Sequence, residues 1–179
     1  WSPATPGPHR GEAVYLDPAH PEEALELLGT LKGKIVLLGR WNPGEYLSES
    51  DAKTTARRKM MAALVTEGAA ALLLTSDKAD GLLNMNGSPR PRALAWLPKI
   101  PTGFLTLESM GLLKRLCARR ESVQIELELG GKLGRAPVRA FNTLAELRGS
   151  EHPEEIVLRG AHIDSWDLGT GATDNGTGV

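Results

Sequence analysis

The pattern of apolar and polar positions divides the first part of the chain into alternating strand and helix candidates. Residues 32–40, KGKIVLLGR, form a short apolar run bounded by glycine, which is typical of a buried strand. Residues 51–69 then place apolar side chains at helical spacing, with Gly68 near the expected C-terminal end. The expected apolar face of this helix consists of Met60, Met61, Leu64 and Val65. Residues 69–76, AAALLLTS, form a second buried run, so this order predicts a right-handed crossover between parallel strands.

A second helix and a further strand follow a stretch of turn-forming residues. Residues 77–99 predict a long exposed loop, which either faces a cleft or partner or is a surface loop only. Residues 106–120 predict a helix with Thr106 as its N-cap. The side chains expected to face the core from it are Leu112, Leu113 and Leu116. Residues 122–130 alternate between apolar and polar side chains, which predicts a half-buried strand. The opening WSPATPGPHRG is rich in proline and glycine and is expected to be irregular.

A change of composition predicts a domain boundary late in the chain. Residues 130–138, GGKLGRAPV, combine adjacent glycines with a proline. We therefore assign residues 1–136 to a first domain and residues 137–179 to a second. Within the second, residues 139–147 and 154–162 are predicted strands, paired as a hairpin or placed as neighbours in one sheet.

Composition excludes several classes of function. The 21 basic and 22 acidic residues give a formal net charge of -1, so no overall field favours nucleic acid or an anionic membrane. The short basic clusters lack the interleaved aromatic residues of a nucleic-acid groove. The single cysteine, Cys117, excludes an internal disulfide and a cysteine-rich zinc module, and it is expected to be a small core residue. No apolar run is long enough to predict a membrane span, and no signal peptide is recognisable.

The candidate chemistry lies in the closing stretch RGAHIDSWDLGTGATDNGTGV, residues 159–179. His162 and Asp164 stand two apart at the end of a predicted strand, so their side chains are expected on one face. A carboxylate in that place accepts one imidazole N–H and directs the other ring nitrogen at a metal ion. Asp174 follows through a glycine-rich loop that can bend sharply, and the two oxygens of a carboxylate can bridge two metal ions.

Other interpretations of the same residues stay open at this point. The His-x-Asp spacing also fits a strand-end histidine that is hydrogen-bonded to a nearby acid, and Asn175-Gly176 fits an ordinary tight turn. Three motifs are excluded. A dinucleotide fingerprint counted from Gly169 meets Asp174 where it needs glycine, a P-loop lacks its lysine, and Ser165 is not framed by the glycines of a serine-hydrolase elbow.

Residues 142–178, NTLAELRGSEHPEEIVLRGAHIDSWDLGTGATDNGTG, closely resemble the start of the catalytic domain in two-zinc peptidases of the plasma glutamate carboxypeptidase type. These enzymes belong to the larger aminopeptidase and glutamate carboxypeptidase family. The preceding segments, from KGKIVLLGR to VQIELELGG, occur in the order found in the protease-associated domain of similar enzymes. The resemblance implies an α/β protein: a protease-associated domain, as a β-rich open barrel or sandwich with flanking helices, followed by the first strands of an α/β zinc-peptidase domain.

Position by position, the resemblance implies that His162 binds one zinc ion and that Asp174 bridges two. Asp164 would act at the catalytic centre by orienting His162, without binding metal. Similar enzymes also hold the peptide bond after the bridging aspartate in cis, which here is Asp174–Asn175. The remaining histidines, His9, His20 and His152, stand in proline-containing loops and are not expected to be ligands. Two zinc ions are the implied cofactors of a complete site.

The implied activity is that of an exopeptidase, which hydrolyses dipeptides or short peptides with a metal-activated water and a glutamate as general base. Because that glutamate and the other metal ligands have no counterpart up to Val179, we expect residues 1–179 alone to be inactive and to bind zinc weakly. The alternative is a non-catalytic interaction module with a degenerate metal site, as in the transferrin receptors. The resemblance further implies an extracellular or periplasmic location and a homodimer of the complete enzyme. These residues do not decide between aminopeptidase and carboxypeptidase specificity.

Overall fold

The computed structural model describes residues 2–18, 20, 26–27, 29–40, 52–76, 78–83, 99–119, 121–132, 134, 137–165 and 169–179. The chain divides into two compact units, Trp1–Leu133 and Gly134–Val179.

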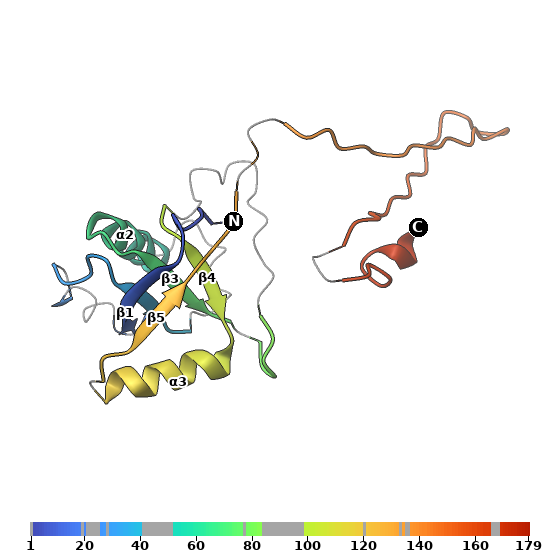
Figure 1. Ribbon diagram of the computed structural model, residues 1–179. Coiled ribbons are helices and arrows are strands. Elements are labelled where there is room, and N and C mark those ends of the chain that lie inside the picture. The colour runs from blue at the N-terminus through green and yellow to red at the C-terminus, as the bar shows by residue number, and fades with distance from the viewer. Residues whose placement is uncertain are drawn as a thin grey trace. The chain divides into compact units, whose positions relative to one another are not determined.

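The first unit is built on a five-stranded sheet with the strand order β4-β3-β2-β1-β5 (Figure 1). Its strands are β1 (His9–Leu16), β2 (Ile35–Leu38), β3 (Ala71–Thr75), β4 (Thr102–Leu105) and β5 (Gln124–Leu127). Neighbours among β1 to β4 pair in parallel, whereas β5 pairs antiparallel with β1. Helix α2 (Ala52–Thr66) connects the paired strands β2 and β3, which confirms the predicted parallel crossover.

Two helices cover opposite faces of this sheet. Val36 of β2 packs in the same apolar cluster as Leu64 of α2. The next residue, Leu37, packs in a second cluster with Met110 of α3 (Leu107–Ala118). Because successive strand residues point to opposite faces, α2 and α3 must lie on different sides of the sheet. Burial on both faces explains why the central strands read as continuous apolar runs.

The predicted first residues of helix α3 are confirmed, but its predicted core face is partly wrong. Thr106 caps the helix, and its hydroxyl accepts a hydrogen bond from the backbone N–H of Ser109 at 3.2 Å. Met110 is buried and Leu113 packs beside it, whereas Leu112 is 50% exposed. Two residues correspond to about 200° around a helix, so a face centred on Met110 turns Leu112 toward solvent.

Strand β1 begins at His9, inside the opening segment that was expected to be irregular. Gly11 lies within this strand, where a Cβ atom would stand only 2.9 Å from the carbonyl oxygen of Gly33. The glycine therefore marks a close approach of two backbones and not a turn. His9 is consequently a strand residue, and its Nε2 lies 3.2 Å from the same carbonyl oxygen.

The N-terminal residues connect the two edge strands of the sheet. The backbone N–H of Thr5 donates to the carbonyl oxygen of Leu129 at 2.9 Å, and the N–H of Leu129 donates back to the Thr5 hydroxyl at 3.0 Å. At the other edge, the N–H of Thr102 donates to the hydroxyl of Ser2 at 2.6 Å. These bonds hold the start of β4 and the residues after β5 to one short segment.

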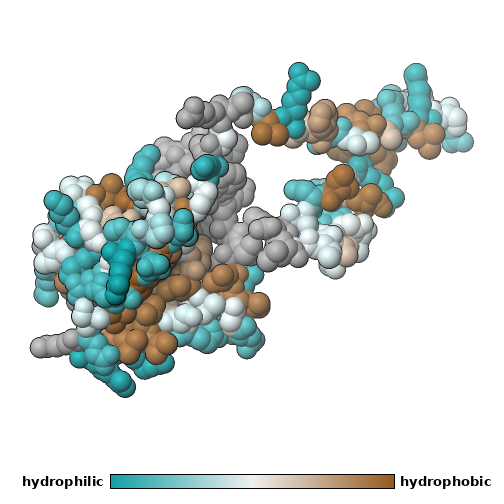
Figure 2. Space-filling view, viewed as in Figure 1, coloured by the Kyte–Doolittle hydropathy of each residue, from teal (hydrophilic) through white to brown (hydrophobic). Residues whose placement is uncertain are grey.

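In the second unit, the prediction of two strands is wrong. The first strands expected for a peptidase domain are therefore not present at these residues. Residues 139–147 and 154–162 are irregular and exposed. Their apolar side chains stand at the surface, brown in Figure 2, with Phe141 and Leu158 86% and 88% exposed. A strand needs a hydrogen-bonded neighbour, and the described residues of this unit include no strand that could serve as one. The regular element described here is η3 (Gly176–Gly178), a single 3-10 turn.

The mixed α/β class predicted from the sequence is confirmed for the described chain. Most of the predicted 77–99 loop lies outside the described residues, and residues 78–83 form turns. Cys117 packs against the cluster around Met110, in agreement with a small core side chain, and burial raises the pKa of its thiol. Among the residues described, no helix has the length and apolar character to cross a membrane.

Candidate metal site

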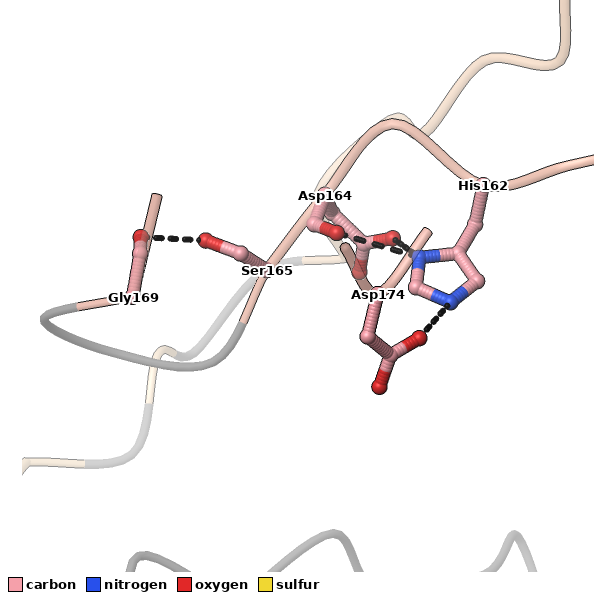
Figure 3. Close-up of polar contacts among 5 residues, drawn as sticks. All are labelled: His162, Asp164, Ser165, Gly169 and Asp174. Carbon is pink, nitrogen blue, oxygen red and sulfur yellow. Dashed lines mark hydrogen bonds and ion pairs between the residues drawn. The ribbon is translucent and has the colours of Figure 1, made fainter. Parts of the chain in front are cut away.

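The side chain of His162 lies between two aspartates in the second unit (Figure 3). Its Nε2 atom is 3.0 Å from Oδ1 of Asp174. Its Nδ1 atom is 3.0 Å from both the backbone carbonyl oxygen and Oδ1 of Asp164. Both ring nitrogens therefore have an oxygen partner, although the imidazole itself is 51% exposed.

A short loop returns the chain to His162 and delivers Asp174. The N–H of Gly176 donates to the carbonyl oxygen of Gly171 at 2.8 Å, which closes the loop behind Asp174. The hydroxyl of Thr177 donates to the carbonyl oxygen of Thr173 at 3.0 Å. These two bonds fix the backbone on both sides of the aspartate, since each spans its position in the chain.

Glycines are required in this loop for steric reasons. A Cβ atom on Gly176 would lie 2.7 Å from the Gly171 carbonyl oxygen, closer than such atoms approach in proteins. Gly171 itself has a φ of 69°, in the left-handed region that glycine adopts readily. The peptide bond between Asp174 and Asn175 is cis, as predicted.

The surroundings of His162 favour its charged form. The backbone carbonyl of Asp164 raises the pKa of the imidazole, and the carboxylate of Asp174 adds to this effect, while slight desolvation opposes it. The arrangement thus concentrates negative charge around an imidazole. With Asp164 on Nδ1 and Asp174 facing Nε2, the site can hold either a proton or a metal cation between Nε2 and the Asp174 carboxylate.

The donor atoms fit a zinc ion, although they form only part of a coordination shell. Zinc takes imidazole nitrogen and carboxylate oxygen at about 2.0–2.2 Å, so two ligands of one ion are at most about 4 Å apart. The 3.0 Å between Nε2 of His162 and Oδ1 of Asp174 lies within that limit. Within the described chain, no group of three or more histidine, cysteine or acidic side chains is arranged so that all could bind one metal ion.

The other histidines have different partners. His152 contacts Glu154 at 3.3 Å in an exposed turn, and His9 contacts a backbone carbonyl beside β1. Asp167, the remaining acid of the closing stretch, lies outside the described residues. The sequence singled out Gly176 only as part of an Asn-Gly turn and did not single out Thr177, because their hydrogen bonds to Gly171 and Thr173 carry no periodic signal.

Comparison with known proteins identifies the class to which this segment belongs. Residues 142–179 match the model of Peptidase family M28. The segment that carries His162, Asp164 and Asp174 is therefore similar to M28 peptidases, which confirms the resemblance to such a peptidase recognised from the sequence.

Particular relatives agree with this class. The chain is 44% identical over 83 residues to carboxypeptidase Q of Rattus norvegicus, 42% to that of Homo sapiens and 40% to that of Xenopus laevis. Each match covers 46% of this chain but only 17% or 18% of the relative. The chain thus corresponds to less than a fifth of the length of these enzymes. Among solved structures, an aminopeptidase from Aneurinibacillus sp. strain AM-1 matches with a TM-score of 0.47 and 16% identity, over 72% of this chain and 26% of the other.

Proposed function

We propose that the protein is a zinc-dependent exopeptidase in which His162 and Asp174 bind metal. The observation that carries this proposal is the 3.0 Å approach of His162 Nε2 to Asp174 Oδ1, within the segment that matches the M28 peptidases. A histidine nitrogen and a carboxylate oxygen at ligand spacing are the donors that a zinc peptidase uses. Asp174 has a second oxygen, Oδ2, so it is the residue proposed to bridge two ions.

Asp164 has a separate role in this proposal. Its oxygens accept the proton of Nδ1, so Nε2, which faces Asp174, is the ring nitrogen that would give up its proton to bind a metal ion. A zinc ion bound there supplies a Lewis acid for water and for the scissile carbonyl. The part played by this chain is then to hold one imidazole in the correct tautomer and one carboxylate at the correct distance.

The domain assignment, substrates, location and assembly are proposed from the similarity to the same enzymes. We assign residues 1–136 as a protease-associated domain and residues 137–179 as the start of the catalytic domain. Dipeptides or short peptides are the proposed substrates, an extracellular or periplasmic compartment the proposed location, and a homodimer of the full-length enzyme the proposed assembly. Residues 1–179 by themselves are expected to be inactive, because two donors do not fill two coordination shells.

The test uses the full-length protein, purified with its metal. We expect bound zinc, and hydrolysis of short peptides that is lost on chelation and restored by zinc. His162→Ala and Asp174→Asn should each weaken zinc binding by about 100-fold or more, since even partners of metal ligands are worth about 10–100-fold. Peptides blocked at one terminus will distinguish aminopeptidase from carboxypeptidase activity.

His152→Ala is the matched control, because His152 has an acidic neighbour two residues on, as His162 does. It should leave zinc content and hydrolysis unchanged. A full-length protein that holds no metal and cleaves no peptide in the panel would contradict the proposal, and would favour a non-catalytic interaction module.

A further inference from the structure

The two segments that carry the candidate ligands touch each other at a glycine. Gly178 lies against Ala161, the residue before His162, and a Cβ atom on Gly178 would stand 2.9 Å from the Cβ of Ala161. Real Cβ atoms do not approach so closely, so any side chain at position 178 would force the segments apart. The contact exists because Gly178 has no side chain.

We propose that Gly178 is a positioning residue for the metal site, which sets the distance between His162 and Asp174. This inference rests on the proposed function. Ala161 is bonded directly to His162, and Gly178 donates its N–H to the carbonyl oxygen of Asn175 at 2.9 Å, next to Asp174. A displacement at this contact is therefore transmitted to both candidate ligands over a short path.

Other glycines of the loop do not serve the same purpose. Gly176 packs on Gly171 within the loop itself, so it shapes the turn and not the distance between segments. A Cβ atom on Gly171 would lie 3.0 Å from the Cβ of Ser165, but the φ of 69° at Gly171 opposes any substitution whatever the space. Gly178 does not have a positive φ, so only the contact distances oppose a side chain there.

A second neighbour of Gly178 is less restrictive. The same Cβ atom would lie 2.5 Å from Oδ1 of Asn175, but this oxygen is the end of a side chain and can rotate away. The Cβ of Ala161 is fixed to the backbone and cannot. The steric cost of a side chain at 178 therefore falls mainly on Ala161, and removing the Ala161 methyl group should relieve it.

The experiment compares four forms of the full-length protein: wild type, Gly178→Ala, Gly160→Ala, and the double variant Gly178→Ala with Ala161→Gly. Gly160→Ala is the matched control, because a Cβ atom there would meet nothing within 4 Å. The readouts are the zinc dissociation constant, measured by competition with a chromophoric chelator, and the visible absorption of the cobalt-substituted protein. Thermal unfolding of the metal-free forms reports whether each variant is folded.

We expect Gly178→Ala to bind zinc about 10–100-fold more weakly, the range found for residues that orient metal ligands, and to change the cobalt spectrum. Gly160→Ala should match wild type. The double variant should recover most of the lost affinity, because the clash is specific to the Ala161 methyl group. If Gly178→Ala does not fold, recovery of folding and affinity by the double variant supports the inference.

Wild-type affinity in Gly178→Ala, or a double variant that stays as weak as the single one, would overturn the inference. His162→Ala in the same assay separates this outcome from failure of the proposed function. If His162→Ala loses zinc while Gly178→Ala does not, only the positioning role is wrong. If His162→Ala also binds zinc normally, the proposed metal site and the positioning role are both wrong.

Discussion

The Nε2 atom of His162 lies 3.0 Å from Oδ1 of Asp174, although the two residues are twelve positions apart in the chain. The approach depends on the return loop, in which Gly176 and Thr177 hold the backbone on both sides of the aspartate. The closure of this loop therefore brings the two side chains together.

Asp164→Asn should weaken zinc binding by the full-length protein about tenfold, near the lower end of the range for partners of ligating histidines. The backbone carbonyl of Asp164 also accepts from Nδ1 and is retained in the variant, which limits the loss. The measurement is a zinc competition titration. Glu154→Gln, which alters the equivalent neighbour of His152, is the control and should have no effect.

Met110→Ala should lower the free energy of unfolding by about 2–5 kcal/mol, since it removes a buried side chain from the cluster between α3 and the sheet. Leu112→Ala, two residues along the same helix, should change it by no more than about 0.5 kcal/mol because Leu112 is half exposed. Urea unfolding followed by circular dichroism compares the two. Equal losses would contradict the observed orientation of α3.

Thr5→Val should lower the free energy of unfolding by about 1–3 kcal/mol, because the variant leaves the N–H of Leu129 without its acceptor in a poorly hydrated place. Hydrogen exchange at the Leu129 amide should accelerate, while Thr5→Ser, which keeps the hydroxyl, should retain protection. Thr30→Val removes an exposed hydroxyl that donates to Leu27 and serves as the control. Unchanged exchange at Leu129 in Thr5→Val would show that the N-terminal segment does not hold this edge of the sheet.

Stability should depend on the ionisation of Glu108. Hydrogen bonds from backbone N–H groups, first its own and then that of Gly81, hold the pKa of this carboxyl below its ordinary value of 4.5. Because the folded-state pKa is lowered, this stabilisation is fully present above pH 4.5 and is lost as the pH falls through the folded-state value.

Glu108→Gln keeps an acceptor for the N–H of Gly81 but removes the charge. The variant should therefore show a weaker loss of stability below pH 4.5 than the wild type. Unfolding curves measured across this range make the comparison, and a carboxyl titration by NMR gives the pKa directly. A Glu108 carboxyl that titrates at or above its ordinary value would contradict the prediction.

The sequence by itself determined the local elements of the first unit and the kind of chemistry in the second. Continuous apolar runs predicted the buried strands β2 and β3, because strands covered on both faces need apolar side chains at every position. Thr106 was identified as an N-cap from its place before an apolar helical pattern, since a cap acts within one turn. Residue types and spacing in the closing stretch allowed a metal site among other interpretations, and the peptidase class was recognised from the resemblance of residues 142–178 to such enzymes.

The tertiary structure decided those features that depend on contacts between residues distant in the chain, namely strand pairing and the spacing of the candidate ligands. Strand β1 was not predicted, because a glycine such as Gly11 in a proline-rich segment is typical of a turn. Its close approach to the backbone of Gly33 exists only in the folded protein. The strands predicted after residue 138 did not form, because strand-forming residues need a hydrogen-bonded neighbour that their own sequence does not supply. Likewise, the sequence named His162 and Asp174, but their separation follows from how closely Gly178 lets the loop approach Ala161. Periodicity and capping are short-range and can be read along the chain, whereas hydrogen-bond pairing and steric contact between distant segments exist only in the folded protein.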